Sequence, residues 1–548
     1  MKEEILKFFK GVADDSEEAL AKYSKDASIF EIRPKLVLYP LDSDDVVNLV
    51  EWVSANKEKY PDLSITARCA GTDMSGGAIG ESIVLDFTRY MNKIITFDGD
   101  RITVEPGMLY RDFEKITLAK GLILPCYTAS KSMNAMGGMF GNNSAGEKTL
   151  KYGKAEDYIL ESKVVFADAV ERTVKPFPLS EIVGQEEIYK KVYNLIKGNE
   201  GEIKNAKPNV HKNSAGYYVW NVIKNNIFDL NKLLVGSQGT LGIATEITFK
   251  LVSVAQSSKL VVIFMRDLEP LGRLVGEILV EKPEALEAYD DKTLWLAVKF
   301  FREFLKNKGF LEMVKFFWSF LPEFKMMLRG GFPKLVLLVE FAGENEQNLN
   351  YKCEKMIEKI KNFQVEVHVT KDRNEAGKYW DIRRESFNLL RKHIHGKRTA
   401  PFIDDIIVRP EFLPKFLPEL NRILGEYKLI YTIAGHAGDG NFHIIPLMDF
   451  SRPGVSQVIN ELSEKVYDLV LRYQGSITAE HNDGLIRTPY LEKMYGARIT
   501  SIFKEVKKIF DPKNIFNPGK KIPVAGGPGT KEYIASHLAL EHHAKHGV

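Results

Sequence analysis

Three glycine-dense segments interrupt the first half of the chain, and they constrain its fold more than any other feature. Residues 67–80 read ARCAGTDMSGGAIG, residues 135–158 read AMGGMFGNNSAGEKTLKYGKAEDY, and residues 235–243 read VGSQGTLGI. Short β-type runs such as SITAR and IVLDFT flank the first segment, and helical patterns such as DSDDVVNLVEWVSANK alternate with them. Successive glycine amides can wrap a phosphate group. The three segments therefore predict an α/β unit that binds an anion, although each one alone is more typical of a sharp turn.

The spacing within these segments excludes two common nucleotide-binding motifs. None matches G-x-x-x-x-G-K-[ST], and none has the G-x-G-x-x-G spacing of a dinucleotide-binding unit. A nucleoside triphosphatase and a nicotinamide-dependent enzyme are both disfavoured.

The sequence pattern changes near residue 255, where the second half of the chain begins. The runs KLVVIFM and KLVLLVEF are candidates for buried strands, and with IVRP and NFHIIPL they predict a mainly antiparallel sheet covered by helices. Residues 455–511 are helical in pattern, interrupted by GSITAEHNDGLIRTP. The overall prediction is an α+β fold.

Composition and termini narrow the class of protein. The chain has 548 residues with 44% hydrophobic and 27% charged content, and its net charge of +3 indicates no general affinity for nucleic acid. No secretory signal is evident at the amino terminus, and no apolar run approaches the roughly 18 residues of a membrane span. Cys69, Cys126 and Cys353 form no C-x-x-C pair, zinc knuckle or iron–sulfur ligand set. We expect a cytoplasmic protein.

Taken together and in this order, the three segments resemble the flavin domain of the vanillyl-alcohol-oxidase/p-cresol-methylhydroxylase superfamily. More narrowly, they resemble its branch of D-lactate, glycolate and D-2-hydroxyglutarate dehydrogenases, and the resemblance extends over residues 30–521. It implies that the first segment binds the FAD pyrophosphate, the second borders the flavin and ribityl chain, and the third contacts adenosine. The implied residues are, in that order, Ala70, Gly71, Thr72, Met74, Ser75 and Gly76; Gly137, Gly138, Asn143, Ala145, Gly146 and Gly153; and Gly239, Thr240, Gly242 and Ile243. Asn517, in the closing motif DPKNIFNPGKK, is a further implied flavin neighbour.

The chain departs from the family pattern at Cys69 and Asp73, where relatives usually carry glycine. A carboxylate beside a pyrophosphate is electrostatically unfavourable, so we expect Asp73 to point away or to cap amides of its own loop. In members of this superfamily with covalent flavin, the flavin is usually attached to a histidine or cysteine near these segments. No histidine occurs in the first 210 residues of this chain. Noncovalent FAD is therefore expected, with Cys69 and Cys126 as the alternatives.

Two histidines lie in the glycine-rich stretch GHAGDGNFH at residues 435–443, and AEHNDG follows at residues 479–484. The resemblance implies that His436, His443 and Glu480 hold a divalent metal beside the flavin. Two imidazoles and one carboxylate form an open ligand set suited to Zn²⁺ first, and also to Mn²⁺ or Fe²⁺. His481 is the expected catalytic base, although a structural role for it stays open. The alternative for the whole stretch is a tight turn with two surface histidines.

The far end of an acidic substrate requires a cation. The segment WDIRRESFNLL at residues 380–390 resembles a family motif, and it makes Arg384 the first candidate and Arg383 the second. A solvated helix face is the alternative. The substrate-positioning lysine of the family has no clear counterpart, since Lys397 is out of register.

The resemblance implies a domain order and a function. Residues 1–252 are expected to form an FAD-binding domain of two α/β subdomains, residues 253–450 a substrate domain, residues 451–523 a helical part that completes the site, and residues 524–548 a tail. The expected enzyme is an FAD- and metal-dependent dehydrogenase that oxidises a D-2-hydroxy acid to the 2-oxo acid. A flavin oxidase that uses oxygen, or a flavin-binding subunit of a larger electron-transfer complex, is the alternative.

An external electron acceptor is expected, either a quinone or an electron-transfer or iron–sulfur protein. Aromatic, methionine and basic residues mix in residues 299–332. This segment suits either a buried helical part of the substrate domain or a surface that docks on a partner or on the inner face of a membrane. A homodimer also stays open.

Overall fold

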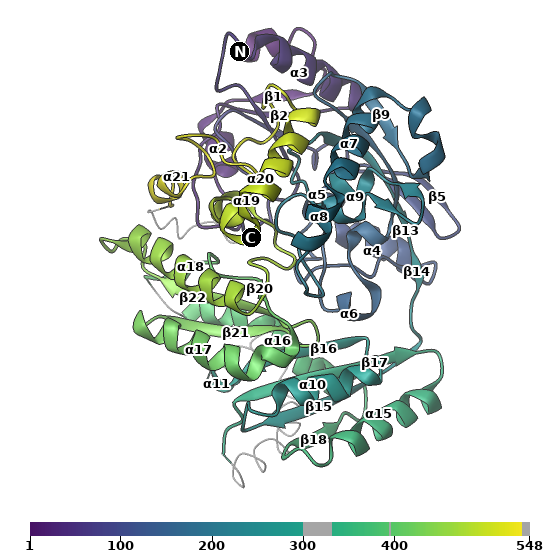
Figure 1. Cartoon of the computed structure of the whole chain (residues 1–548), viewed down its shortest axis with the longest axis vertical. Coiled ribbons are helices and arrows are strands. Elements are labelled where there is room, and N and C mark those ends of the chain that lie inside the picture. The colour runs from purple at the N-terminus through teal and green to yellow at the C-terminus, as the bar shows by residue number, and fades with distance from the viewer. Residues whose placement is uncertain (300–330, 394–395, 540–548) are drawn as a thin grey trace.

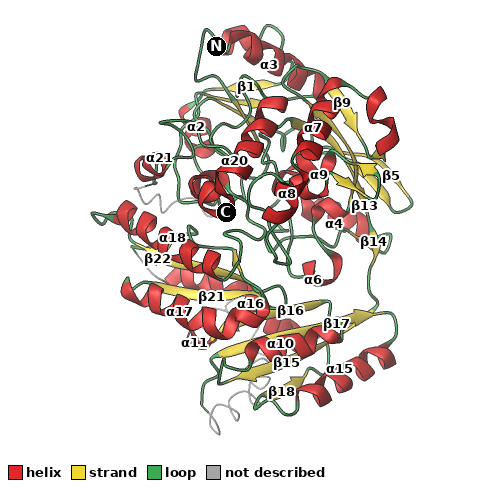
Figure 2. Cartoon of the chain, viewed as in Figure 1, coloured by secondary structure: helices red, strands yellow, loops and turns green. Residues whose placement is uncertain are grey.

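The computed structural model describes residues 1–299, 331–393 and 396–539 (Figure 1). Most of the aromatic segment 299–332 lies outside these residues. The described chain has an upper part that contains the amino terminus and a lower part built on one large sheet, as the secondary-structure colouring shows (Figure 2). This mixed α+β architecture confirms the predicted fold class.

The upper part contains two main sheets. The first has the order β1–β2–β4–β3, in which β3 (Ile65–Arg68) and β2 (Leu36–Tyr39) both run parallel to β4 (Ile83–Asp86) and β1 (Val12–Asp14) runs antiparallel to β2. Asp42 accepts a hydrogen bond from Asp45 N at 3.1 Å and so caps the start of helix α3 (Ser43–Asn56). The glycine-rich loop at residues 69–80 connects β3 to β4.

The second upper sheet is antiparallel, with the order β5–β6–β13–β8–β9. Its strands are β5 (Ile94–Asp98), β6 (Arg101–Val104), β13 (Ile243–Lys250), β8 (Ile159–Val165) and β9 (Glu171–Val174). Short helices α5 (Met136–Asn142) and α6 (Thr149–Tyr152) carry the second glycine segment, and the third leads directly into β13. Each glycine-rich segment thus lies at the end of a regular element.

The lower part is an eight-stranded sheet whose pairings are all antiparallel, as the sequence predicts. Its order is β18–β15–β17–β16–β21–β22–β19, and β20 also pairs with β22. The strands are β15 (Ser257–Met265), β16 (Ala285–Asp290), β17 (Leu335–Gly343), β18 (Glu366–Val369), β19 (Arg398–Thr399), β20 (Ile406–Ile407), β21 (Ile430–His436) and β22 (Asn441–Met448).

Helices cover both faces of this sheet, which explains the continuous apolar run in KLVVIFM. Val261 and Ile263 pack in a core with α10 (Leu271–Val280), α15 (Glu346–Ile360), α17 (Leu413–Glu426) and α18 (Val455–Arg472). Val262 and Phe264 point to the other face and pack with α11 (Asp291–Lys299) and α16 (Arg373–His393). Because alternate residues of a strand face opposite sides, a sheet covered twice needs apolar residues at every position.

The helical carboxyl-terminal part is shared between the two halves. Helix α18 packs in the core of the large sheet, whereas α20 (Leu491–Phe510) packs in the core of the upper antiparallel sheet. Phe516 then forms a parallel bridge with Ile65 beside β3. The chain therefore crosses from the lower to the upper part between α18 and α20, through the segment that contains Glu480 and His481. The domain boundaries given above stay predictions.

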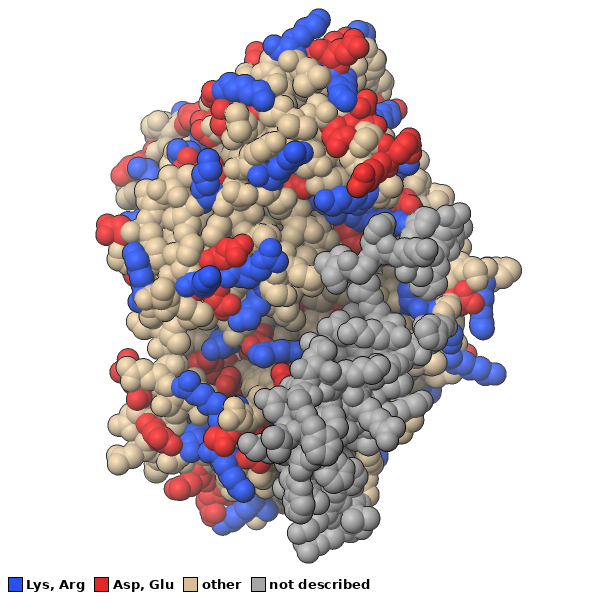
Figure 3. Space-filling view, turned by 180° about the vertical axis from the view of Figure 1, so that it is seen from behind, with Lys and Arg blue, Asp and Glu red and all other residues tan. Residues whose placement is uncertain are grey.

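None of the described helices is long and apolar enough to cross a membrane. On the face seen from behind, Lys and Arg side chains alternate with Asp and Glu side chains (Figure 3).

Candidate active site

A β-hairpin brings the two histidines of GHAGDGNFH onto one face of the large sheet. In the register of β21 and β22, His436 pairs with Asn441 and Ala434 pairs with His443. His436 and Ala434 lie two residues apart and so face the same side, which makes His436 and His443 diagonal neighbours. Their ring centroids are 5.2 Å apart. Gly440, in the turn, has φ +76, and a Cβ there would lie 1.9 Å from the Val408 carbonyl oxygen, so only glycine fits.

The carboxylate of Glu480 lies where three imidazole rings converge. Its Oε1 is 3.1 Å from Nε2 of His436, 3.4 Å from Nε2 of His443 and 4.0 Å from Nε2 of His481. The His481 ring stacks on the His443 ring at 4.9 Å between centroids. One carboxylate oxygen and three ring nitrogens thus face a common centre.

Each of the three rings is oriented through its other nitrogen by a buried carboxylate. His436 Nδ1 lies 2.5 Å from Glu287 Oε1, His443 Nδ1 lies 3.2 Å from Asp404 Oδ1, and His481 Nδ1 lies 2.7 Å from Asp404 Oδ2. Because a carboxylate accepts a hydrogen bond, a neutral ring at each of these positions would carry its proton on Nδ1 and present the lone pair of Nε2 to the centre. Carboxylate partners of this kind orient metal-binding histidines in proteins.

The electrostatics of the cluster favour positive charge at its centre. Burial alone would lower the pKa of His443, but Asp404 and Glu480 raise it to about 10. Burial likewise opposes protonation of His436 and His481, but Glu287 and Asp404 respectively raise the pKa of these rings. Burial raises the pKa of the Glu480 carboxyl, yet Lys212 and the histidines hold it well below its usual range.

Asp405 also lies in this cluster, with one ligand atom within 4.8 Å of those of His443, Glu480 and His481. Its Oδ2, however, accepts hydrogen bonds from the backbone N–H groups of residues 479, 480 and 481 at 2.7 to 2.8 Å. Its Oδ1 accepts from Asn441 Nδ2 at 3.0 Å. Both oxygens are engaged, so Asp405 shapes the loop that presents Glu480. Asp405, His443, Glu480 and His481 are the group whose ligand atoms lie within this distance of one another among the described residues, and the set of His436, His443 and Glu480 stays a prediction.

The segment after His481 connects this cluster to all three glycine-rich segments. Asn482 Nδ2 donates to the carbonyl oxygens of Asn142 and Gly236, at 3.3 and 2.9 Å. Gly484 N donates to Gln238 Oε1 at 2.9 Å, and Leu485 N donates to the Ser75 carbonyl oxygen at 2.9 Å. The histidine cluster and the predicted flavin segments therefore border one another.

The first glycine-rich loop offers the amides that a pyrophosphate requires. Within the described part of the chain, the N–H groups that make no hydrogen bond in this loop include those of Ala70, Gly71, Thr72, Met74 and Gly76. Gly71 has φ +68, and a Cβ there would lie 2.2 Å from the Arg68 guanidinium. Asp73 accepts from Ser75 N at 3.0 Å and from Gly77 N at 2.6 Å, which confirms that this carboxylate caps its own loop. Ser75 N is consequently already bonded, whereas the amides of the other five predicted residues remain for an anion.

Among the other predicted FAD neighbours, three side chains make hydrogen bonds within the protein: those of Asn143, Thr240 and Asn517. Asn143 is left-handed, with φ 54, and its side chain bonds with Glu156 at 3.0 Å. Thr240 is fully buried and donates to the Ser237 carbonyl oxygen at 2.7 Å. Asn517 Nδ2 donates to the carbonyl oxygens of Gly77 and Gln238, both at 2.8 Å, and so ties the first loop to the third. The remaining positions lie along the same segments: Gly137 and Gly138 in α5, Ala145, Gly146 and Gly153 around α6, and Gly239, Gly242 and Ile243 before and at the start of β13.

Neither cysteine near these segments is set up as a nucleophile. Cys69 Sγ donates to the Pro106 carbonyl oxygen at 3.3 Å, and burial raises the pKa of its thiol to about 12. Cys126 is fully buried, and burial raises the pKa of its thiol as well. Because the thiolate is the reactive form, both residues favour noncovalent binding of FAD.

The two arginines of α16 have different environments. Arg383 bonds with Glu287 at 3.0 Å and so supports the carboxylate that orients His436. Arg384 is 44% exposed at its side chain and bridges to Glu147, next to Gly146, at 2.6 Å. Glu147 also accepts from Tyr127 Oη at 3.0 Å. Arg384 is therefore the more exposed of the two, and its role towards a substrate stays a prediction.

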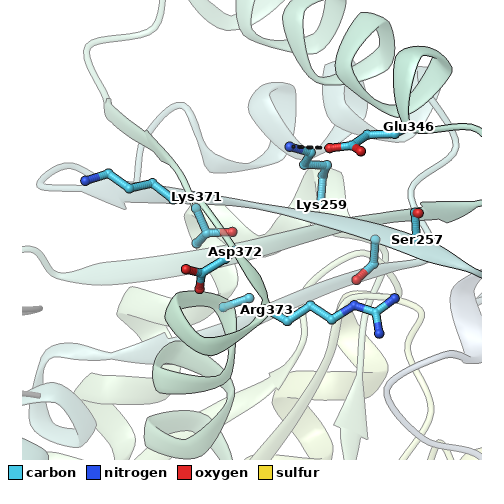
Figure 4. A pocket seen from close by; sticks show the side chains of 9 residues that line it. Ser257, Lys259, Glu346, Lys371, Asp372 and Arg373 are labelled. Carbon is cyan, nitrogen blue, oxygen red and sulfur yellow. Dashed lines mark ion pairs between the residues drawn. The ribbon is translucent and has the colours of Figure 1, made fainter. Parts of the chain in front are cut away.

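A cavity of about 240 Å³ lies at the other edge of the large sheet, by β15 and β18 (Figure 4). Lys259 pairs there with Glu346 at 3.3 Å, and Arg373 donates to the Gln256 carbonyl oxygen at 2.5 Å. Figure 4 shows Lys371 pointing away from Arg373. These cations do not converge on one point, so the cavity is not a candidate active site.

Four residues of the histidine cluster were not identified from the sequence: Lys212, Glu287, Asp404 and Asp405. The register of β16 with β21 places Ala288 opposite Gly435, and therefore Glu287 beside His436. Asp404 and Asp405 precede β20, which pairs with β22 next to His443. These strand pairings are long-range, and the only local signal was the pair of acids before the apolar run in FIDDIIV.

Comparison with known proteins gives two family matches. The family described as "FAD binding domain" matches residues 34–174, and the family described as "FAD linked oxidases, C-terminal domain" matches residues 254–521. Among solved structures, p-cresol methylhydroxylase with substrate bound has a TM-score of 0.67 at 14% identity, covering 94% of both chains. Alkyldihydroxyacetonephosphate synthase has a TM-score of 0.65 at 15% identity, covering 95% of this chain and 85% of that one. These likenesses concern the fold.

Curated relatives are similar over nearly the whole chain. D-2-hydroxyglutarate dehydrogenase of Escherichia coli (strain K12) is 26% identical over 521 residues, which are 92% of this chain and 49% of the relative. Glycolate oxidase subunit GlcD of Bacillus subtilis (strain 168) is 26% identical, covering 92% and 93%. D-lactate dehydrogenase of Anaerostipes hadrus is 25% identical, covering 92% of each. The chain spans about half the length of the first of these relatives and almost the whole length of the other two.

Proposed function

Since the chain belongs to the FAD-linked oxidases, with an FAD-binding domain and the C-terminal domain of that family, we propose that it is a metal-dependent dehydrogenase of D-2-hydroxy acids. The observation that carries this proposal is the convergence of three imidazole Nε2 atoms on Glu480 Oε1, directly beside the glycine-rich segments. An FAD-binding protein without chemistry of its own would not need this arrangement.

The charges around the cluster fit a divalent cation. Five carboxylates surround it, and three cations contact them or their backbone. The carboxylates are Glu287, Asp404, Asp405, Asp439 and Glu480, and the cations are Lys212, Arg383 and Arg487. With neutral imidazoles, and leaving aside His211 at the surface, two negative charges remain. One divalent ion would offset them, with His436, His443 and Glu480 as its ligands. Nitrogen and oxygen donors suit Zn²⁺ first and Mn²⁺ or Fe²⁺ next.

The remaining roles follow from the positions of the side chains. When bound, FAD supplies the acceptor for the hydride from C2 and the divalent ion supplies a Lewis acid for the oxygen atoms of the substrate. His481 takes the proton of the C2 hydroxyl on Nε2, because Asp404 holds the proton of the other ring nitrogen on Nδ1. Arg384 exchanges Glu147 for the distal part of an acidic substrate. The products are the 2-oxo acid, a protonated His481 and a two-electron-reduced cofactor.

The substrate class rests on the relatives. They are dehydrogenases of D-2-hydroxyglutarate and D-lactate and a glycolate oxidase subunit, at 24 to 26% identity. All three acids carry a hydroxyl next to a carboxylate, the pair of oxygens that the open positions of such a metal site can chelate. We extend this class, including the D configuration, to the present chain.

The electrons must leave the flavin for an outside acceptor. An iron–sulfur cluster takes four protein ligands, usually cysteines. The chain has three cysteines, and they lie at distant positions in the sequence. We propose a quinone or a separate electron-transfer protein as the acceptor. The place of action in this proposal is the cytoplasm or the inner face of a membrane.

A chelation and reconstitution experiment tests the proposal. The yellow protein is treated with EDTA, desalted and assayed by dye reduction with D-lactate, glycolate and D-2-hydroxyglutarate, before and after addition of Zn²⁺ or Mn²⁺. The proposal expects activity to disappear with the metal, to return with the added ion, and to leave the FAD content constant throughout. Full activity of metal-free protein would contradict it.

A further inference from the structure

Lys212 is a fully buried cation at the edge of the histidine cluster. Its Nζ donates to Glu480 Oε2 at 2.8 Å and lies 3.2 Å from Asp439 Oδ2. Its side chain is 0% exposed, and both carboxylates are almost completely buried. Lys212 comes from the FAD-binding half of the chain, Asp439 from the turn between β21 and β22, and Glu480 from the segment that crosses between the two halves. One ammonium group thus joins three segments at the site.

Because of this ammonium, the two carboxylate oxygens of Glu480 have different contacts. Oε2 is occupied by Lys212, whereas Oε1 faces the Nε2 atoms of His436, His443 and His481. A carboxylate held in this way can offer only one oxygen to a metal ion.

We propose that Lys212 is a positioning residue that keeps Glu480 a single-oxygen ligand and, through its charge, makes the bound divalent ion a stronger Lewis acid. The inference rests on the metal site proposed above. A ligand oxygen that shares its negative charge with an ammonium donates less charge to the ion, so the ion withdraws more electron density from the substrate hydroxyl. Lys212 therefore opposes tight binding of the ion and favours the reaction.

Two other roles for Lys212 make different predictions. In a proton relay to the surface, Lys212 would pass a proton towards Asp439 and the half-exposed His211, which pair with each other. The Nζ of Lys212 lies between two buried carboxylates, those of Asp439 and Glu480, which stabilise its charged form, so the group does not relay protons. As a simple support of the fold, Lys212 would lower metal affinity when replaced, which is opposite to the effect of its charge.

The test compares Lys212→Met, Lys212→Gln and a matched control, Lys521→Met. Lys521 is also 0% exposed and pairs with a buried carboxylate, Asp483, at 2.8 Å. Its Nζ donates to the carbonyl oxygens of Ser214 and Gly216, close in sequence to Lys212, but to none of the predicted metal ligands. Each FAD-loaded protein is stripped of metal and titrated with Co²⁺. The dissociation constant, the visible spectrum of bound Co²⁺ and kcat are measured.

Lys212→Met should bind Co²⁺ at least as tightly as wild type, with a weaker visible band because Glu480 can then supply both oxygens. Its kcat should fall about 10-fold to 100-fold, as is typical when a partner of a metal ligand is lost. Lys212→Gln removes the charge but keeps a donor for Glu480, so Co²⁺ should bind at least as tightly with the wild-type spectrum. Lys521→Met should leave both Co²⁺ readouts unchanged.

Two results would overturn the role of Lys212 while leaving the metal site intact. One is a wild-type Co²⁺ spectrum and dissociation constant in Lys212→Met. The other is loss of Co²⁺ from both Lys212 variants while FAD is retained, which would make Lys212 a structural support. Failure of wild type to bind any divalent ion would instead refute the metal site itself.

Discussion

His436, His443 and His481 show how much of a site single residues can reveal. The spacing in GHAGDGNFH and the adjacent glutamate and histidine in AEHNDG gave the four residues that converge, because residue type and family motif are local properties of the sequence. The carboxylates behind them, Glu287 and Asp404, have no such signature. They reach the histidines through strand pairing between distant segments, which no local pattern encodes.

Substitutions of the histidines should separate metal binding from proton transfer. His436→Ala and His443→Ala should lose the metal and the activity while keeping FAD, because the flavin segments lie elsewhere in the chain. His481→Gln should keep metal and FAD, with a rate constant for flavin reduction about 100-fold to 10,000-fold lower, the usual contribution of a general base. Elemental analysis, flavin absorbance and stopped-flow reduction measure the three quantities.

His368→Ala serves as the control, since His368 pairs with Glu375 at 2.9 Å at the β18 edge of the sheet. Full metal occupancy in His436→Ala, or normal flavin reduction in His481→Gln, would refute the corresponding role.

Among the elements, the hairpin of β21 and β22 and the loop after β3 depend on glycine for different reasons. Gly440 turns the hairpin beneath the Val408 carbonyl, and Gly71 allows the first loop to pass close to Arg68. Glycine-rich sequence predicted the turn and the loop. The contact that makes each glycine necessary comes from a segment outside the turn or at the edge of the loop, so the sequence did not identify these two glycines among the others.

These two glycines give a double test of the site. Gly440→Ala should lose metal but keep FAD, with a loss of stability of at least about 1–3 kcal/mol from strain at a positive φ. Gly71→Ala should lose FAD but keep metal. Gly276→Ala in α10, where a Cβ would meet no atom within 4 Å, should be neutral or slightly stabilising. Loss of both ligands in both variants would show that the two sites are not separately built.

Strand β16 supports the hairpin with a carboxyl whose ionisation is unfavourable. Asp290 is 8% exposed and accepts from Ile433 N at 3.1 Å and Thr293 N at 2.9 Å, and burial raises its pKa from 3.8 to about 6. The folded state therefore keeps a proton that the unfolded chain loses as the pH rises from about 4 to 6. Over this window the raised pKa of Asp290 lowers the free energy of unfolding by up to about 3 kcal/mol.

Asp290→Asn should remove this dependence. The melting temperature of the variant, relative to wild type, should rise between pH 4 and pH 6 and then stay level. Asp291→Asn, at the exposed neighbouring position, provides the control. A constant difference between variant and wild type across this range would refute the ionisation of Asp290 as the cause.

At the scale of the whole molecule, the predicted architecture holds, but the route of the carboxyl-terminal part is more specific than expected. Helical periodicity predicted α18 and α20 without indicating that one packs on the large sheet and the other on the FAD-binding half. Which core a helix joins depends on complementary surfaces far away in sequence. The crossing between these helices is also where Glu480 and His481 lie, so the candidate site is built from residues of both halves.

The cofactor should come away from the folded molecule without breaking a bond. Cys69 and Cys126 are buried thiols of raised pKa, and no histidine lies near the flavin segments in the sequence. Acid or heat precipitation should therefore leave the yellow colour in the supernatant, identified as FAD by chromatography. Colour that remains with the pellet would show a covalent link.

The central claim is that FAD and the histidine cluster act together on a D-2-hydroxy acid. The most direct measurement is the visible flavin band under anaerobic conditions after addition of the D and L forms of lactate and 2-hydroxyglutarate, and of glycolate, to the metal-loaded protein. At least one D acid or glycolate should bleach the band within the time of mixing, the L forms should not, and prior removal of the metal should abolish the bleaching. A flavin band that stays oxidised with every acid, or that bleaches equally after the metal has been removed, would contradict the account.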